Sequence, residues 1–444
     1  MPDDDREHPL NNNNTLQRQG AGLGSRVTGY GLFMLTLVYA FNFVDRQILV
    51  VLQEPIKNEM GLSDAQLGLL SGFSFALVYI TAGIPIAYWA DRTNRRNIIA
   101  AALTVWSGMT ALSGFAQNYT QLLLARIGVG IGEAGGSPPA HSMISDYYPP
   151  EKRGTALAIY STGVHIGVLL GFVLGGTISQ LYGWRIAFLA VGLPGVVLAV
   201  IFLLTVREPR RGRWESAAEA GYQPNLKETL AVLRSYRSFW YLAAGAGLTA
   251  FVGYGSGNFA PSFMVRSHGL DMAEVGIILA IFGGGGGFIG TFLGGYLADR
   301  LGVGDRRWYL WVPAIAGALA IPLGFPYLLL DNTTVVIGFL FVVTICINTY
   351  LGPCLAISHT LVPPAMRALT SAVLFFVLNL IGLGLGPLTT GLLSDFYAAY
   401  VGQDSLRYAM LTVGLLGSPA VLFYALAARH LPADLARSAE RSGG

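Results

Sequence analysis

One stretch of the sequence occurs twice, and the repeat decides how the chain is organised. Residues 61–92 read GLSDAQLGLLSGFSFALVYITAGIPIAYWADR, and residues 269–300 read GLDMAEVGIILAIFGGGGGFIGTFLGGYLADR. The copies align without a gap at an offset of 208 residues. Each opens with a helix-capping pattern, Ser63 to Gln66 and Asp271 to Glu274, which satisfies free amides of a first helical turn. Each ends in Ala-Asp-Arg, so the sequence predicts two parallel halves.

The composition places these halves in a membrane. Of the 444 residues, 53% are hydrophobic and only 12% are charged, whereas soluble surfaces need about a quarter to a third charged residues. The net charge of +3 is too small to indicate a nucleic-acid partner. The 57 glycines suit helices whose backbones approach closely in lipid. Cys346 and Cys354 show neither a disulfide framework nor a metal-ligand spacing, so no metal or cofactor is expected.

Twelve apolar stretches follow one another along the chain, and each has the roughly 20 residues that a bilayer-spanning helix needs. They are expected at residues 29–51, 66–90, 97–117, 120–147, 154–180, 185–206, 238–265, 272–298, 308–330, 334–360, 367–394 and 405–429. The first run is full length and starts too late for a cleavable signal peptide, so it is expected to remain as helix 1. The prediction is an all-α membrane protein with six spans in each half.

Basic residues are distributed unequally between the joints, and this predicts the orientation. Of the 28 Lys and Arg residues, 22 fall on joints that share a side with the N-terminus and four on the opposite side. Positive joints remain in the cytoplasm, so both termini are expected there. The predicted parts are a disordered cytoplasmic tail (1–28), two six-helix halves (29–206 and 238–429), a cytoplasmic linker (207–237) and a second cytoplasmic tail (430–444). Leucines at helical spacing in the linker indicate either an amphipathic surface helix or a solvated charged segment.

Short motifs carry a resemblance to a known family. They read Ala87-Tyr-Trp-Ala-Asp91-Arg92-Thr-Asn94-Arg95-Arg96 after the second span, Gly295-Tyr-Leu-Ala-Asp299-Arg300-Leu-Gly302 in the second half, and Arg126-Ile-Gly128-Val-Gly130-Ile-Gly132-Glu133-Ala134 in the fourth span. They are similar to the loop signature and the Arg-and-glycine motif of the major facilitator superfamily, although Ala87 and Asn94 replace two glycines of the loop signature. The resemblance implies the major facilitator fold, with 12 transmembrane helices in two pseudo-symmetric six-helix halves, and alternating access.

Within the superfamily, the chain resembles the Spinster-like lipid transporters in a bacterial-type form. The resemblance rests on Asn42-Phe-Val-Asp45-Arg46 in the first span and on the loop and fourth-span motifs quoted above. It implies a lysolipid or a sphingoid phosphate as substrate. It also implies that Asp45, Arg126 and Glu133 take part in coupling and transport.

Four ionisable residues lie deep within the predicted spans, all in the first half: Asp45, Arg46, Arg126 and Glu133. Charged groups in lipid are costly, so each is a functional candidate. Arg126 and Glu133 are seven residues apart and share one helix face. We expect Asp45 and Glu133 to border the central cavity with Arg126 between them, so that movement relative to the cation switches proton affinity. The alternative is a fixed Asp45–Arg126 ion pair that holds helices 1 and 4 together.

The substrate is expected between a charged N-terminal face and an apolar, aromatic C-terminal face. The predicted substrate-binding residues are Arg46, Arg126, Glu133, Asn42, Phe259 and Asn379. For Arg46, a packing contact with Glu133 or a carbonyl fits equally well. The resemblance implies a gating role, with loop folding as the alternative, for Asp91, Arg92, Arg95, Arg153, Asp299 and Arg300. Asp91 is expected near the start of helix 11 and near Arg153, and Asp299 at the symmetric place on helix 5.

These features together predict a secondary active transporter and not an enzyme, since no nucleophile with its base and no metal cluster is found. The expected cargo is a small amphipathic, lipid-like molecule that a monomer moves across the bilayer with protons, in the inner membrane if the source is bacterial. A proton-coupled exporter of hydrophobic drugs and a carrier of small organic anions are the alternatives. A receptor or a channel is a further alternative, which the duplicated loop motif disfavours.

Overall fold

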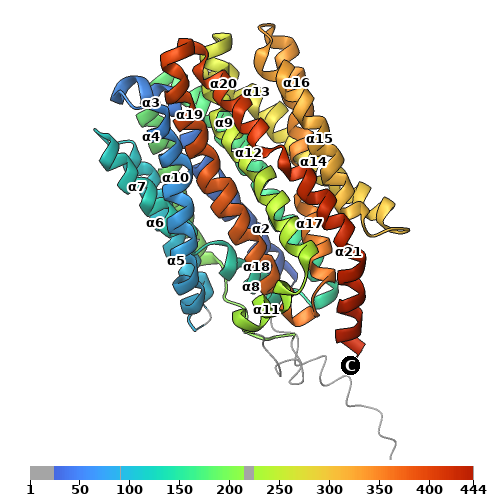
Figure 1. Ribbon diagram of the computed structural model, residues 1–444. Coiled ribbons are helices and arrows are strands. Elements are labelled where there is room, and N and C mark those ends of the chain that lie inside the picture. The colour runs from blue at the N-terminus through green and yellow to red at the C-terminus, as the bar shows by residue number, and fades with distance from the viewer. Residues whose placement is uncertain (1–24, 91, 215–224, 444) are drawn as a thin grey trace, which may run out of the picture.

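The computed structural model describes residues 25–90, 92–214 and 225–443, and its regular structure in these ranges is helical (Figure 1). The first half contains α2 (Ser25–Val51), α3 (Gln53–Met60), α4 (Asp64–Gly68), η1 (Leu69–Phe73), α5 (Ser74–Ala90), α6 (Arg95–Ser113), α7 (Tyr119–Glu133), α8 (Ser137–Tyr147), α9 (Pro150–Tyr182) and α10 (Trp184–Thr205). The linker helix α11 (Leu226–Arg234) precedes α12 (Arg237–His268), α13 (Met272–Ile278), η2 (Leu279–Gly284), α14 (Gly285–Gly302), α15 (Trp308–Leu329), α16 (Thr333–Ile347), α17 (Leu351–Thr360), η3 (Pro364–Met366), α18 (Arg367–Val377), η4 (Leu378–Leu385), α19 (Gly386–Val401), η5 (Gly402–Asp404), α20 (Ser405–Gly417) and α21 (Pro419–Gly443).

Each predicted span coincides with one helix or with a run of consecutive helical segments, which confirms the all-α membrane architecture. In the described part of the chain, eight helical stretches are long and apolar enough to cross a membrane. The last of them, Pro364–Arg441, contains two of the predicted spans. The predicted spans at 97–117, 120–147 and 238–265 are helical but are not among these eight stretches.

Both copies of the repeat begin with the predicted cap. Ser63 Oγ accepts from the Gln66 amide at 3.2 Å, and the Gln66 side chain accepts from the Ser63 amide at 2.9 Å. Asp271 and Glu274 form the same reciprocal pair at the start of α13. After one or two turns each helix widens into a π-helical turn, η1 or η2, and η1 shifted by the repeat offset overlaps η2. A third π-helical segment, η4, lies between α18 and α19.

The run of five glycines from Gly283 to Gly287 lies at the second of these π turns. A Cβ atom on Gly283 or Gly284 would meet nothing closer than 3.5 Å, and one on Gly285 would meet nothing within 4 Å. Close packing therefore does not account for these three glycines. Since π turns often mark functional sites in helices, the geometry favours a bending role here.

The helices at both ends of the described chain extend beyond the predicted boundaries. Helix α2 already begins at Ser25, and α21 continues to Gly443, so residues 430–443 are not a free tail. Asp434 on α21 is fully buried and accepts from the amide and the hydroxyl of Ser238, at 2.8 and 2.6 Å. This carboxylate caps the start of α12 and anchors α21 to it. Residues 1–24 of the predicted tail and residues 215–224 of the linker lie outside the described residues.

The linker forms the helix that its leucines predict. In α11, Leu233 is fully buried in the core of the second half, whereas Leu226 and Leu230 remain exposed. The helix packs against α12 and α18. We term the side of the molecule that carries α11 the linker side and the opposite side, where α3 and the start of α4 lie, the far side (Figure 1).

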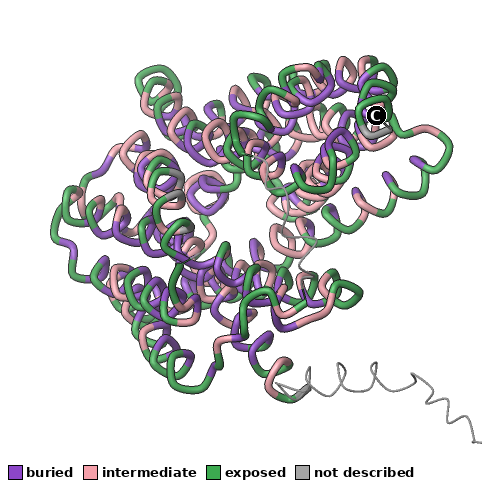
Figure 2. Tube along the Cα trace, turned by 90° about the horizontal axis from the view of Figure 1, so that it is seen from below, coloured by how far each residue is buried: buried purple, intermediate pink, exposed green. Residues whose placement is uncertain are grey.

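The two halves meet mainly on the far side. There α4 packs along α19, and α13 packs along α9. On the linker side, in the described part of the chain, α5 does not pack closely on α18, nor α9 on α14. Viewed from this side, the helices lie around the centre of the view (Figure 2). In the described residues, the two halves are thus in close contact on the far side but not on the linker side.

Candidate functional site

Arg46, on α2, is held by one carboxylate and three aromatic rings. Its Nε donates to Glu133 Oε2 at 2.5 Å. Its guanidinium carbon lies 4.8 to 5.3 Å from the ring centroids of Phe75, Phe43 and Tyr79, where cation–π attraction operates. About a fifth of the Arg46 side chain, 22%, stays exposed. The rings come from the first half, so the charged site is itself aromatic, contrary to the expected division between the halves.

Asp45 and Arg126 lie deeper, 0% and 2% exposed. Arg126 Nη1 donates to the main-chain carbonyl of Asp45 at 3.3 Å. The Asp45 carboxylate accepts instead from Ser107 Oγ on α6, at 3.1 Å. In the described residues, the two side chains form no ion pair within 4 Å, so the fixed salt bridge considered above is not present. Asp45 is enclosed between α2 and α6 and does not border an open cavity.

Three polar atoms of this cluster are buried without a hydrogen-bond partner in the described residues: Asp45 Oδ1, Arg126 Nε and Glu133 Oε1. Folded proteins rarely leave such atoms unsatisfied, and a buried charge without a partner is costly. The arrangement can therefore take up two further species. An anion would satisfy Arg126, and a proton would neutralise the buried charge of Asp45.

The other predicted substrate-binding residues lie in different surroundings. Asn42 is 5% exposed and neighbours Glu133, and Asn379 is half-buried in η4. Phe259 is fully buried in the apolar core where α12 meets the first half. Its assignment to substrate binding is therefore corrected to packing, because its ring is enclosed by apolar side chains of both halves and has no polar atom that a ligand would satisfy. Tyr254, on the same helix, is 37% exposed and near enough to Arg46 for electrostatic interaction, so it replaces Phe259 as the candidate.

Ion pairs join the two halves on the far side. Arg266 on α12 donates to both carboxylate oxygens of Asp64, each at 2.7 Å, and to Glu54 at 2.7 Å. Asp64 also accepts from Lys57 at 2.5 Å and from Ser394 at 2.6 Å. Glu54, Lys57 and Asp64 belong to the first half, and Arg266 and Ser394 to the second. Together with Asp395, we term these residues the far-side network.

Asp395, near the end of α19, adds a contact of a different kind. Its two carboxylate oxygens accept from the amides of Asp64 and Ala65, each at 2.9 Å. These are free amides of the first turn of α4, at the positive end of a helix that continues to Ala90. A carboxylate of one half thus caps the membrane-spanning helix of the other.

Glycines let the backbones of the two halves touch on this side. A Cβ atom would lie 2.2 to 2.4 Å from a carbonyl oxygen of the opposite half at each of Gly68, Gly176, Gly276 and Gly391. No larger residue fits at such distances. The predicted use of glycine for close helix approach is confirmed at these positions.

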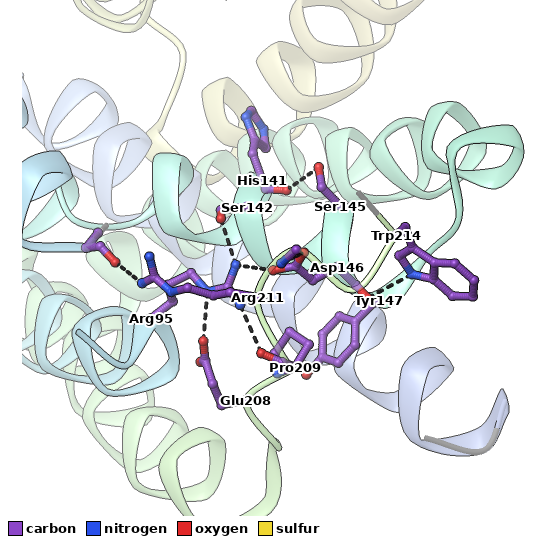
Figure 3. Close-up of polar contacts among 12 residues, drawn as sticks. Arg95, His141, Ser142, Ser145, Asp146, Tyr147, Glu208, Pro209, Arg211 and Trp214 are labelled. Carbon is purple, nitrogen blue, oxygen red and sulfur yellow. Dashed lines mark hydrogen bonds and ion pairs between the residues drawn. The ribbon is translucent and has the colours of Figure 1, made fainter. Parts of the chain in front are cut away.

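On the linker side, Arg95 is the centre of a buried network within the first half (Figure 3). Its guanidinium donates to Asp146 at 2.5 Å, to Ser142 and Glu208 at 2.7 Å each, and to the Pro209 carbonyl at 3.0 Å. Trp214 Nε1 donates to the Asp146 carbonyl at 3.0 Å. These bonds hold the segment that follows α10 against the start of α6 and the end of α8. We term this segment the strap.

The comparisons with known proteins agree with this architecture. The family model described as Major Facilitator Superfamily matches residues 35–387. A crystal structure of a bacterial homolog to the human lysosomal transporter Spinster, in an inward-facing and unoccupied conformation, superposes with a TM-score of 0.85 at 34% identity, over 93% of this chain and 99% of that one. The chain is a Spinster-like transporter of the Major Facilitator Superfamily.

Two curated relatives are also transport proteins. The MFS-type efflux pump of Mycolicibacterium smegmatis is 33% identical, over 94% of this chain and 96% of that protein. The probable L-galactonate transporter of Escherichia coli is 25% identical, over 91% of this chain and 90% of that protein. This Spinster-like chain is accordingly an integral membrane transporter and not an enzyme.

The predicted gating residues of this transporter do not join the halves in the described structure. Asp91 lies outside the described residues. Arg92, just after α5, donates to the Tyr88 carbonyl of that helix, and Arg153 donates to two carbonyls at the end of α8. Asp299 accepts from Tyr309, and Arg300 donates to Tyr296. Asp299 is thus not at the expected place on α9. This agrees with the lack of close packing between the described parts of the two halves on the linker side.

The far-side network was missed because its residues look structural in the sequence. Asp64 falls within a helix-capping pattern, and Asp395 lies near the end of a predicted span. One signal was available. Arg266 is one of only four basic residues on joints predicted to lie opposite the N-terminus, where positive charge is disfavoured, so it needed a specific partner.

Glu208 offers a test of the strap. It bonds Arg95 and also accepts from the Arg96 amide at 2.9 Å, at the start of α6. We expect Glu208→Gln to lower the free energy of unfolding by about 1 to 2 kcal/mol, because a charge-assisted bond and a favourable charge at a helix end are lost. Denaturation of the purified variant measures this effect. Glu440→Gln, which changes an exposed carboxylate near the end of α21, is the matched control, and equal stabilities of the two variants would contradict the assignment.

Proposed function

We propose that this transporter moves an amphipathic organic anion, of the lysolipid or sphingoid phosphate type, by proton-coupled alternating access. The observation that carries the proposal is the state of Arg126. Its guanidinium is sealed in the membrane-spanning part of the first half without a carboxylate within 4 Å in the described residues. Such a cation is costly alone, and the phosphate or carboxylate of a substrate would supply the missing charge.

Arg46 supports the same site for the head group. It lies next to Glu133 and keeps part of its surface exposed. We propose that Arg46, Arg126 and Glu133 surround the polar head, with Asn42 beside them and with Tyr254 and Asn379 on the opposite half. The apolar tail would lie along exposed aromatic side chains of the second half, such as Phe375 and Phe376.

We further propose that the linker side faces the cytoplasm, with both termini there, and that the protein works as a monomer in the cell membrane. The far-side network then holds the state that is open to the cytoplasm. In the opposite state we expect Asp91 to cap the start of helix 11 near Arg153, with Arg92, Arg95, Asp299 and Arg300 arranging the two loops. Because the two sets of contacts hold different arrangements of the same two halves, the two sides are not open at the same time.

Flux into reconstituted vesicles tests the substrate class. The panel contains a lysophospholipid, a sphingoid phosphate, the sugar acid L-galactonate and a neutral hydrophobic dye, each with an imposed pH gradient. We expect the two amphipathic anions to accumulate, and to do so only with the gradient. Accumulation of L-galactonate alone would establish the carrier of small organic anions, which the E. coli relative and the chemistry of Arg126 favour as second candidate. Accumulation of the dye alone would overturn the anionic substrate.

Asp45 provides the test of coupling. Asparagine has nearly the same shape and can keep the bond to Ser107, but it cannot exchange a proton. We expect Asp45→Asn to stay folded and to move substrate down its own concentration gradient, while accumulation driven by the pH gradient is lost. Glu59→Gln, at an exposed carboxylate on the far side, is the control. Unchanged accumulation in Asp45→Asn would rule out Asp45 as the coupling group.

A further inference from the structure

The second half encloses an empty apolar space that the transport mechanism does not use. It lies between α12, α15, α16 and α20, with a volume of about 100 Å³ behind an open mouth. Val252, Leu328, Val343 and Met410 are among the residues that line it. A cavity of about 150 Å³ with apolar walls already stays dry and binds small apolar molecules. This space is somewhat smaller, but it is open on one side, so it can take the end of a hydrocarbon chain whose remainder stays outside.

At three glycines on its walls, a larger side chain would not clash with the rest of the protein. A Cβ atom on Gly324 or Gly414 would meet nothing within 4 Å, and one on Gly317 would meet only Val421, at 3.5 Å. Glycine inside a helix costs up to about 1 kcal/mol relative to alanine. By contrast, Gly290 and Gly294 of α14 would place a Cβ atom 2.3 and 2.1 Å from carbonyl oxygens of the neighbouring helix. The glycines of the cavity therefore keep room for something other than this chain.

The walls suit hydrocarbon rather than a polar ligand. The hydroxyls of Thr249 and Thr349 line the space but donate to carbonyls of their own chain, at 3.0 and 2.9 Å. Hydroxyls that are satisfied in this way leave the methyl groups to face the space.

The mouth of the space faces lipid. Phe325 on α15 and Leu415 on α20 line it and are themselves exposed, at 39% and 46%. The neighbouring Leu319 and Leu416 are exposed as well, so the opening is continuous with the apolar outer surface that the bilayer covers. We propose that this cavity binds an acyl chain of a bilayer lipid, which enters between α15 and α20. The inference holds whichever substrate the protein carries.

A phosphatidylcholine with a photoreactive diazirine near the end of one acyl chain tests this proposal. The full-length protein is reconstituted in vesicles that contain this lipid, illuminated, and mapped by mass spectrometry. We expect labels on Met410 and Val343, which are buried from the bilayer and line the cavity. Exposed Leu416 reports ordinary contact with lipid in the same sample. Labels on Leu416 without any on Met410 and Val343 would overturn the proposal.

Gly324→Leu fills the cavity without a clash at its Cβ atom. We expect it to reduce labelling of Met410 relative to Leu416 roughly tenfold or more, a change worth about 1.4 kcal/mol. Gly338→Leu is the matched control, since Gly338 is an exposed α16 glycine that meets nothing within 4 Å and does not line the cavity. Gly414→Leu repeats the test from α20 if Gly324→Leu does not fold. Equal labelling in wild type and in the cavity variants, or loss of the label on adding a transported anion, would overturn the assignment to a bilayer lipid.

Discussion

Replacing Arg266 with glutamine is expected to open the far side. Arg266 is the contact of the second half with both Glu54 and Asp64, and all three side chains are at most 16% exposed. Removal of one partner of a buried ion pair costs about 3 to 5 kcal/mol. Because Lys57 and Ser394 still bond Asp64, we expect the lower value, about 3 kcal/mol, which shifts the equilibrium between the two states roughly 100-fold or more.

Double electron–electron resonance measures this shift. Spin labels at Gln117→Cys and Thr334→Cys report the separation of the halves on the far side, in a background with Cys346→Ser and Cys354→Ala. We expect one short distance in the otherwise unchanged protein and a second, longer one in Arg266→Gln. Arg185→Gln is the matched control, because Arg185 pairs with Glu59 on the same side but within one half. An unchanged distance distribution in Arg266→Gln would show that the network does not hold the far side shut.

Replacing Arg126 with glutamine is expected to abolish transport without weakening the fold. A guanidinium that binds the anionic head group contributes directly to binding, and its charge-assisted bonds are each worth about 1.5 to 3 kcal/mol. Two such bonds correspond to a loss of roughly 100-fold or more in transport. The resting protein, however, loses an unpaired buried charge, so its stability should stay the same or rise.

The combination of readouts distinguishes a substrate site from a structural one. Flux of the favoured anion and the midpoint of thermal denaturation are measured on the same preparation. Arg126→Lys, which keeps the charge but loses the planar fork, is expected to retain part of the activity. A large fall in stability of Arg126→Gln would mean that the arginine holds helices together, and intact transport would mean that it does not meet the substrate.

The fold could be predicted from the sequence because its signals are local and repeated. The capping patterns at Ser63 and Asp271 appear in the structure as written, and the hydrophobic runs coincide with the helices. The linker helix also follows from the spacing of its leucines. The ends were less accurate, because the continuation of α21 depends on Asp434 reaching the start of α12, a contact across 196 residues.

The candidate site could be predicted in part. The four charges within the spans were evident, since charge inside an apolar span stands out in any sequence. Their pairing was not, because Arg46 and Asp45 point in different directions from one helix and only the packing of α2 against its neighbours decides which partner each finds. The network of Asp64, Arg266 and Asp395 combines three segments that are far apart in the sequence, so no local sequence pattern predicts it. Phe259 was misassigned because its burial depends on how the halves meet.

The π-helical turns have a further consequence for how the transporter moves. An added residue in a turn interrupts the regular ladder of hydrogen bonds, and helices bend most readily where that ladder is weakened. Three helices at the interface between the halves carry such a turn between their ends. They are the helices that begin at α4, α13 and α18. Their linker-side segments can therefore swing inward while the far-side ends stay docked. A substrate can thus be sealed off from both aqueous phases in an occluded intermediate before any bond of the far-side network breaks.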